Sequence, residues 1–209
     1  MSSQFKLYYF PGRGRAEFIR YILHYTGTPY EEVLIKPDEW VTTFKKQMPM
    51  GVIPVLELAD GRKLSQSLAI GRYLATMKGL VSQDQFENAW GDQLVGAIED
   101  IYPVYYRDYV MAILHGDDEK KAETTKALKE KAFEPLFHML ENFLGEKTYF
   151  CGKQIHWADL VIAELVDRVE TNLGKDLIEG HPKLASHAKR IHELPNLKEY
   201  IESRVPAFA

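Results

Sequence analysis

The first 80 residues alternate short apolar runs with amphipathic segments of helical period. Alternating or β-branched runs predict strands, and apolar residues three or four apart predict helices. The resulting order, βαβ followed by ββα, predicts a small α/β sheet domain over residues 1–79. Strands are expected at residues 5–10, 30–35, 52–58 and 62–65, and helices at 15–25 and 67–77.

After residue 79 the strand signals largely vanish, and apolar residues recur every three or four positions. This period predicts an all-helical domain over residues 84–209, joined to the first domain by a linker at 78–84. Pro103 and Pro135 fall inside long helical patterns and are expected to kink or divide them. The expected helices carry the stripes Phe86, Trp90, Leu94, Ala97, Ile101 and Tyr105; Leu128, Ala132, Leu136, Leu140 and Phe143; and Ile162, Val166, Val169 and Leu173, followed by shorter helices at 183–193 and 196–202.

Composition and charge exclude several classes of partner. The chain has 209 residues, is 45% hydrophobic and 27% charged, and carries a net charge of −4, which gives no case for binding nucleic acid or an anionic membrane surface. No signal-peptide pattern or membrane-length apolar run is present, and the single cysteine, Cys151, cannot form an internal disulfide. We therefore expect a cytoplasmic protein. Three histidines at 181, 187 and 192 lack the spacing of metal ligands, so no metal site is predicted.

Residues 47–74 have the outline of a peptide-binding site. Pro54 follows Ile53 at the start of an extended run, where one strand donor is missing and a cis bond can be held. A hairpin turn is expected at 60–61, and Gln66 and Ser67 then begin a helix whose first N–H groups are unpaired. An edge of backbone beside a helix N-terminus suits a short peptide that carries a carboxylate.

Gly12 and Gly14 follow a predicted strand and precede a helix, which superficially matches a dinucleotide-binding fingerprint. The third glycine of that fingerprint is replaced by Glu17, and the ββα ending interrupts the parallel units that such a fold needs. We interpret the glycines instead as a tight turn after the strand, which leaves Arg13 and Arg15 to place their charges.

Four motifs stand in one order along the chain: Tyr9-Phe10-x-x-Arg13-Gly14-Arg15-Ala16-Glu17; Trp40; the run Met50-Gly51-Val52-Ile53-Pro54-Val55-Leu56; and Gln66-Ser67-Leu68-Ala69-Ile70 with Arg72-Tyr73-Leu74. Together they resemble the cytosolic glutathione transferases, and most of all the sigma class, which includes the glutathione-dependent prostaglandin D synthases. The similarity continues through Trp157-Ala158-Asp159-Leu160 and His181-Pro182, so it covers nearly the whole chain.

The resemblance implies a glutathione transferase fold, with a thioredoxin-like domain followed by an all-α domain that contributes the hydrophobic substrate site. It also implies a glutathione S-transferase that conjugates glutathione, its co-substrate, to hydrophobic electrophiles, as in detoxification. Tyr9 would donate a hydrogen bond to the thiol and favour the reactive thiolate, with support from the charge of Arg15. Tyr8 and Tyr9 face opposite sides of a strand, and the register of the family selects Tyr9.

Further roles follow from the same resemblance. Asp100 would reach the γ-glutamyl amine in the site of a partner subunit, which implies a homodimer. The hydrophobic pocket would be lined by Phe10, Arg15, Tyr105 and Tyr106. The glutathione-binding residues would be Phe10, Trp40, Lys45, Val52, Ile53, Pro54, Gln66 and Ser67, together with Asp100 of the partner.

Several readings stay open at this point. The enzyme could be a glutathione-dependent prostaglandin D isomerase or have a peroxidase side activity, or the chain could be a non-enzymatic, crystallin-like or ligand-binding member. Arg107 stands where the prostaglandin synthases have a pocket tryptophan, which counts against the isomerase. Modulation by magnesium or calcium and the role of residues 204–209 are not readable from the sequence. The tyrosines of the second domain could line a pocket or cover a helix interface: Tyr102, Tyr105, Tyr106 and Tyr109.

Two residues of the second half have structural interpretations. Asp159 is expected to cap the start of a helix, but His156 stands where Ser or Thr would complete a reciprocal capping box, so an incomplete box is predicted. Cys151, between Phe150 and Gly152, is interpreted as a buried apolar filler rather than a catalytic thiol.

Overall fold

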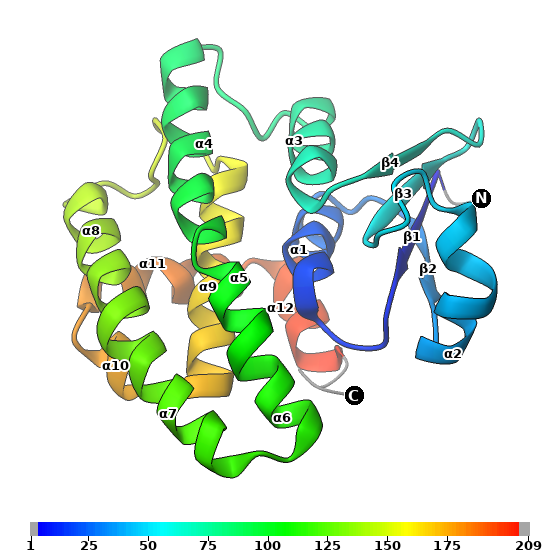
Figure 1. Cartoon of the computed structure of the whole chain (residues 1–209). Coiled ribbons are helices and arrows are strands. Elements are labelled where there is room, and N and C mark those ends of the chain that lie inside the picture. The colour runs from blue at the N-terminus through cyan, green and yellow to red at the C-terminus, as the bar shows by residue number, and fades with distance from the viewer. Residues whose placement is uncertain (1–3, 205–209) are drawn as a thin grey trace. The chain divides into compact units, whose positions relative to one another are not determined.

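A mixed four-stranded sheet in the order β2-β1-β3-β4 organises the start of the chain (Figure 1). In this computed structural model, which describes residues 4–204, β1 is parallel to β2 and antiparallel to β3, and β3 is antiparallel to β4. The strands are β1 (Phe5–Tyr9), β2 (Tyr30–Leu34), β3 (Val55–Leu58) and β4 (Lys63–Ser65). All four predicted strands are therefore found. The third is shorter than predicted, because residues 52–54 precede the paired part of the strand.

Helices α1 (Glu17–Tyr25) and α3 (Ser67–Met77) agree with the two predicted helices of this region. A 3₁₀ turn over Gly14–Ala16 leads into α1. Between β2 and β3 the chain forms α2 (Pro37–Glu39), a π-helical turn (Trp40–Phe44) and a 3₁₀ turn (Lys45–Gln47).

Alternation along β1 divides its side chains between two faces. Phe5, Leu7 and Tyr9 are buried on one face, and Tyr8 packs on the other face. A buried cluster of Ile35, Met48 and Val55 lies there, and the partly buried residues that pack against this cluster are Tyr8, Val33, Trp40, Phe44 and Ile53.

The described chain divides into two compact units, with the boundary at Val81–Ser82. Residues 191–204 belong with the first unit, which includes α12 (Pro195–Ser203). The sequence placed this helix in a helical domain over 84–209, so its position differs from that expectation. The reason is a set of specific contacts with α1: the Tyr200 ring stacks on His24 with centroids 4.0 Å apart, and its hydroxyl donates to Glu17 at 3.0 Å.

The second unit contains helices joined by turns and loops, with no strand among its described residues. Its helices are α4 (Gln85–Glu99), α5 (Tyr102–Val104), α6 (Met111–His115), α7 (Asp118–Leu128), α8 (Glu134–Leu144), α9 (Trp157–Leu173), α10 (Asp176–Glu179) and most of α11 (Pro182–His192). Pro103 and Pro135 lie in the first turns of α5 and α8, beside π-helical turns at Tyr105–Val110 and Lys129–Phe133, so both predicted interruptions are confirmed. Phe86, which was expected in a buried stripe, is 72% exposed.

The start of α9 corrects one prediction. Asp159 accepts a hydrogen bond from the backbone N–H of His156 at 2.8 Å, and Nδ1 of His156 accepts one from the N–H of Ala158 at 3.2 Å. The capping box is therefore complete, since an imidazole nitrogen serves where a hydroxyl was expected. Cys151 is 4% exposed, which confirms its buried position, and burial raises the pKa of its thiol to about 12.

Within residues 4–204, no helix is long and apolar enough to cross a membrane. The same residues contain no group of three or more His, Cys, Asp or Glu side chains that could hold a metal ion.

Candidate active site

The Tyr9 hydroxyl lies at the end of β1, inside a turn formed by the residues that follow it. Its oxygen accepts a hydrogen bond from the backbone N–H of Arg15 at 2.8 Å, and the side chain is 9% exposed. Gly14 has a φ of +44°, and a Cβ at this position would lie 2.3 Å from the Tyr9 hydroxyl oxygen. The glycine therefore allows the turn to close over the phenol. A phenol that accepts such a bond becomes a better donor through its own proton.

Tyr8 has a different environment. Its hydroxyl donates to a carboxylate oxygen of Glu57 at 3.0 Å. Burial, followed by the hydrogen bond and charge of Glu57, raises the pKa of Tyr8 to about 12. The proton of Tyr8 is thus directed to a carboxylate within the sheet, whereas the oxygen of Tyr9 receives a backbone donor. The two adjacent phenols therefore have opposite hydrogen-bond environments.

The predicted residues of the loop region lie near the same end of the sheet. Phe10 packs edge-on against Trp40 with ring centroids 6.0 Å apart, and Tyr9 and Phe10 are in ring contact at 6.1 Å. Trp40 is half-buried at the start of the π-helical turn, and Lys45 is exposed one turn later. Trp40 therefore packs and keeps part of its surface accessible.

The Ile53-Pro54 peptide bond is cis. It directly precedes Val55, which pairs with Tyr8 on one side and with Ser65 on the other. Val52 is 40% exposed, and Ile53 lies before the first paired residue of β3. The backbone at 52–53 thus lies outside the sheet ladder.

Gln66 has a φ of +75°, the only positive φ of a non-glycine residue between residues 4 and 204. Such a conformation is uncommon for a side-chain-bearing residue, and it is concentrated at functional sites. Gln66 is exposed, and the 5%-exposed Ser67 begins the 11-residue helix α3. The first N–H groups of α3, which have no acceptor within the helix, therefore directly follow the positive-φ residue Gln66.

The predicted residues of the second unit fall into two groups. Asp100 is exposed directly after α4. Tyr105 is only 4% exposed and its oxygen accepts a bond from Asn172 at 3.0 Å, whereas the half-buried Tyr106 accepts one from Arg168 at 3.2 Å. Burial supports the helix-interface interpretation for Tyr102, Tyr105 and Tyr109, which leaves Tyr106 as the more accessible ring.

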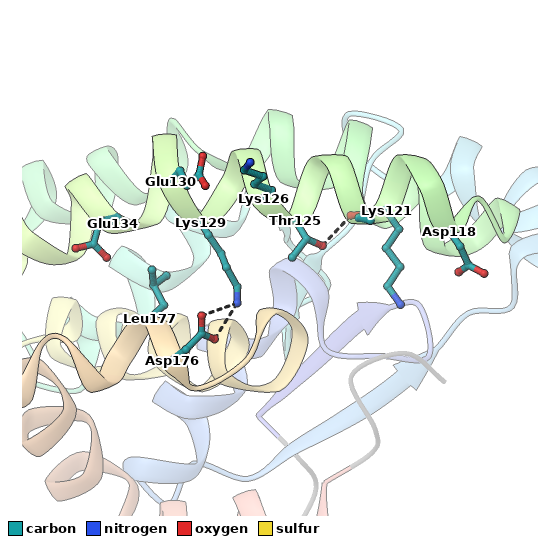
Figure 2. Close-up of a pocket in the computed structure, with 10 residues that line it drawn as sticks. Asp118, Lys121, Thr125, Lys126, Lys129, Glu130, Glu134, Asp176 and Leu177 are labelled. Atoms are coloured by element: carbon teal, nitrogen blue, oxygen red, sulfur yellow. Dashed lines mark hydrogen bonds and ion pairs between the residues drawn. The ribbon is translucent and has the colours of Figure 1, made fainter.

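An open groove of the second unit contains none of the predicted site residues. It has a volume of about 730 Å³ and runs along α7 and α10 (Figure 2). Lys129 reaches across it to Asp176, with the ammonium nitrogen 2.8 Å from a carboxylate oxygen. Lysine and carboxylate side chains are mixed around the groove, so its charge does not match one class of ligand.

Sequence reasoning missed a buried ionic network around α1. Glu17, for which the sequence predicts no ionic partner, is fully buried and paired with Arg20 at 3.0 Å and with Arg204 at 3.0 Å. The three-residue spacing of Glu17 and Arg20 on one helix could have predicted their ion pair. The pair with Arg204 could not be predicted, because the two residues are far apart in the sequence.

Comparison with protein-family models gives two matches. Residues 3–76 match the model "Glutathione S-transferase, N-terminal domain", and residues 106–204 match "Glutathione S-transferase, C-terminal domain". Curated relatives match over nearly their full lengths. A hematopoietic prostaglandin D synthase of Gallus gallus is 34% identical over 208 residues, with 96% of each chain covered. Glutathione S-transferase 3 of Caenorhabditis elegans is also 34% identical, again with 96% of each chain covered.

Solved structures are similar throughout. A glutathione S-transferase of Necator americanus, described as monomeric, has 33% identity and a TM-score of 0.88, with 97% of this chain and 98% of that chain covered. A rat hematopoietic prostaglandin D synthase in complex with a quinoline has 31% identity and a TM-score of 0.85, with the same coverage.

Proposed function

The chain belongs to the glutathione S-transferase family and has its fold, and from this premise we propose that it activates the thiol of glutathione through Tyr9 and conjugates the thiolate to hydrophobic electrophiles. The observation that carries the proposal is the hydrogen bond from the Arg15 N–H to the Tyr9 oxygen. Gly14 allows this bond, because a side chain at residue 14 would collide with the phenol.

Glutathione would bind along the first unit. The backbone of Ile53, beside the cis Pro54 and outside the sheet ladder, would pair with the cysteinyl residue of the tripeptide. Gln66 and Ser67 would bind the γ-glutamyl carboxylate at the start of α3, where a helix N-terminus favours an anion. Residues Phe10, Trp40, Lys45 and Val52 would complete the contacts, with Trp40 and Lys45 at the glycyl end.

In the proposed reaction the thiol loses its proton to solvent while Tyr9 keeps its own, and the thiolate then forms a C–S bond with the electrophile as a leaving group such as chloride departs. A free thiol is mostly protonated near neutral pH, and the thiolate is the nucleophile. A hydrogen bond from the Tyr9 phenol to the sulfur favours the charged form, and each unit by which the thiol pKa falls corresponds to about 1.4 kcal/mol between protonation states. Arg15 contributes its backbone N–H to the phenol, and its positive side chain is a second, supporting group.

A second candidate function, after the transferase, is that of a glutathione-dependent prostaglandin D isomerase. It is favoured by relatives that carry the name prostaglandin D synthase. Arg107, at the position of the pocket tryptophan in those enzymes, is exposed and paired with Asp108 at 2.9 Å, so it is a polar replacement. Conversion of prostaglandin H2, compared with a panel of electrophiles, separates the two activities.

The proposal is tested with a chlorinated nitrobenzene as electrophile and with binding to immobilised glutathione. We expect both conjugation and binding for the natural chain. Tyr9→Phe should reduce thiolate formation at least about tenfold and leave binding largely intact, whereas Tyr8→Phe should have little effect. The absence of both conjugation and binding would favour a non-enzymatic member of the family, and a larger loss with Tyr8→Phe would refute the assignment of Tyr9.

A further inference from the structure

Arg20 on α1 is a buried guanidinium that connects four other groups. It is 3% exposed, and its Nη1 donates to the carbonyl oxygens of Gly12 at 3.0 Å and Arg13 at 3.2 Å, and to Glu17 at 3.0 Å. Its Nε and Nη2 donate to Glu32 at 3.0 and 2.7 Å. All sides of the guanidinium are therefore committed, with one side holding the backbone of residues 12–13.

These two carbonyls belong to the turn that surrounds Tyr9. Two residues later, the N–H of Arg15 donates to the Tyr9 oxygen. The guanidinium carbon of Arg20 also lies 5.8 Å from the centre of the Tyr9 ring. Arg20 is thus linked to the phenol through the backbone that carries its hydrogen-bond donor, and it lies over the ring itself.

We propose that Arg20 is a positioning residue for thiol activation: its guanidinium holds the turn at residues 12–13 so that the Arg15 N–H stays on the Tyr9 oxygen. This inference rests on the proposed function, in which Tyr9 acts on the thiol of glutathione. Arg20 touches neither the phenol oxygen nor the proposed glutathione contacts in the 52–67 region.

The geometry of the guanidinium matters more here than its charge. Glu17 and Glu32 face Arg20, and Glu17 is also paired with Arg204, so two cations balance two carboxylates. A planar fork that bonds two carbonyls and two carboxylates at once is a property of arginine that lysine lacks. Burial disfavours the charged form of Arg20, but Glu32 and Glu17 outweigh it and raise its pKa above the ordinary value, so it stays charged throughout an assay range.

Arg20→Lys separates the two roles, because it keeps a cation beside the buried Glu17 and removes the fork. We expect kcat for conjugation to fall about tenfold or more, with KM for glutathione changed by less than about twofold, because misplaced catalytic groups affect kcat. The pH midpoint of kcat should rise by about one unit. The matched control is Arg62→Lys, at a 77%-exposed arginine paired with Asp60, which should behave as the natural chain does.

A second readout is independent of turnover. The ultraviolet titration of the Tyr9 phenol is obtained as the difference between each protein and its Tyr9→Phe counterpart. If Arg20 positions the Arg15 N–H, Arg20→Lys should move the Tyr9 midpoint to higher pH, because a donor to the oxygen is weakened. An unchanged midpoint and unchanged kcat in a folded Arg20→Lys protein would overturn the proposal, even if the transferase activity itself is present.

If Arg20→Lys does not fold, Glu32→Gln provides the same test. Glu32 is 27% exposed and holds the outer side of the guanidinium without touching residues 12–13. Its neutralisation should shift the Tyr9 titration in the same direction by a smaller amount, and no shift in the folded Glu32→Gln protein would overturn the proposal. Failure of the natural chain to conjugate or to bind glutathione would instead refute the proposed function, and the phenol titration would still decide the role of Arg20.

Discussion

At the scale of single residues, two adjacent tyrosines show how position decides chemistry. Alternation along β1 sends Tyr8 and Tyr9 to opposite faces, and only one of them meets a backbone donor. Sequence alone could state that the two differ, but the choice of Tyr9 came from a family resemblance. The physical reason, a turn closed by Gly14 over the phenol, depends on three-dimensional contacts.

Gly14→Ala tests this closure. The new methyl group would overlap the Tyr9 hydroxyl, so we expect conjugation activity to fall by roughly tenfold or more, with a smaller loss of glutathione binding. The matched control is Gly61→Ala, where φ is +84° and nothing lies within 4 Å of the added carbon. Both variants should lose about 1 kcal/mol in the free energy of unfolding, because alanine is strained at a positive φ. Denaturant unfolding measures this loss. Equal activities in the two variants would contradict a steric role for Gly14.

At the scale of elements, the helical and strand periods of the sequence predict most of the helices and strands. They do not predict which surfaces these elements pack against. The strands of the first unit and the breaks at Pro103 and Pro135 were accessible, because they depend on local pattern and on missing N–H groups. The capping by His156 was not, since histidine is rarely an N-cap and its role depends on which nitrogen faces the helix. The place of α12 was also hidden, because an amphipathic stripe does not say which surface it covers.

Asp159 at the start of α9 should matter for stability more than for turnover. It is fully buried and accepts bonds from the N–H groups of Phe150 and His156 and from Nε2 of His187. Asp159→Ala leaves these donors without an acceptor, so we expect a loss of about 3 kcal/mol in the free energy of unfolding. The rate constant kcat of the folded fraction should change little.

Asp84→Ala is the comparison for that variant. Asp84 is an exposed N-cap of α4 that accepts a single bond from the N–H of Phe86 at 2.8 Å, and its loss should cost about 1 kcal/mol. Chemical denaturation measures both changes. Equal losses for the two caps would show that the buried bonds of Asp159 add nothing to ordinary capping.

At the scale of the whole molecule, we propose that the functional unit is a homodimer in which Asp100 serves the partner's glutathione site. Asp100 is exposed directly after α4, so its side chain is accessible to a second subunit. A relative from Necator americanus described as monomeric makes the assembly of this chain a direct question. Sedimentation at several concentrations answers the question of assembly.

Mixed dimers test the role of Asp100. Asp100→Asn should raise KM for glutathione roughly tenfold, because it weakens a charge-assisted hydrogen bond. A dimer of one Asp100→Asn subunit and one Tyr9→Phe subunit contains one site with both natural residues. We therefore expect refolded mixtures to regain a component with the natural KM, and Asp118→Asn, at an exposed residue of α7, to leave KM unchanged. Mixtures that show only the raised KM would contradict sharing of the site.

The contacts of Glu17 link the start of the described chain to its end. Its carboxylate, fully buried beside the Tyr9 turn, is paired with Tyr200 and Arg204, almost at the far end of the chain. A nascent chain that has emerged only as far as Val81 lacks both of these partners and retains the local pair between Glu17 and Arg20. The buried contacts of this carboxylate are therefore complete only after the final helix has been synthesised.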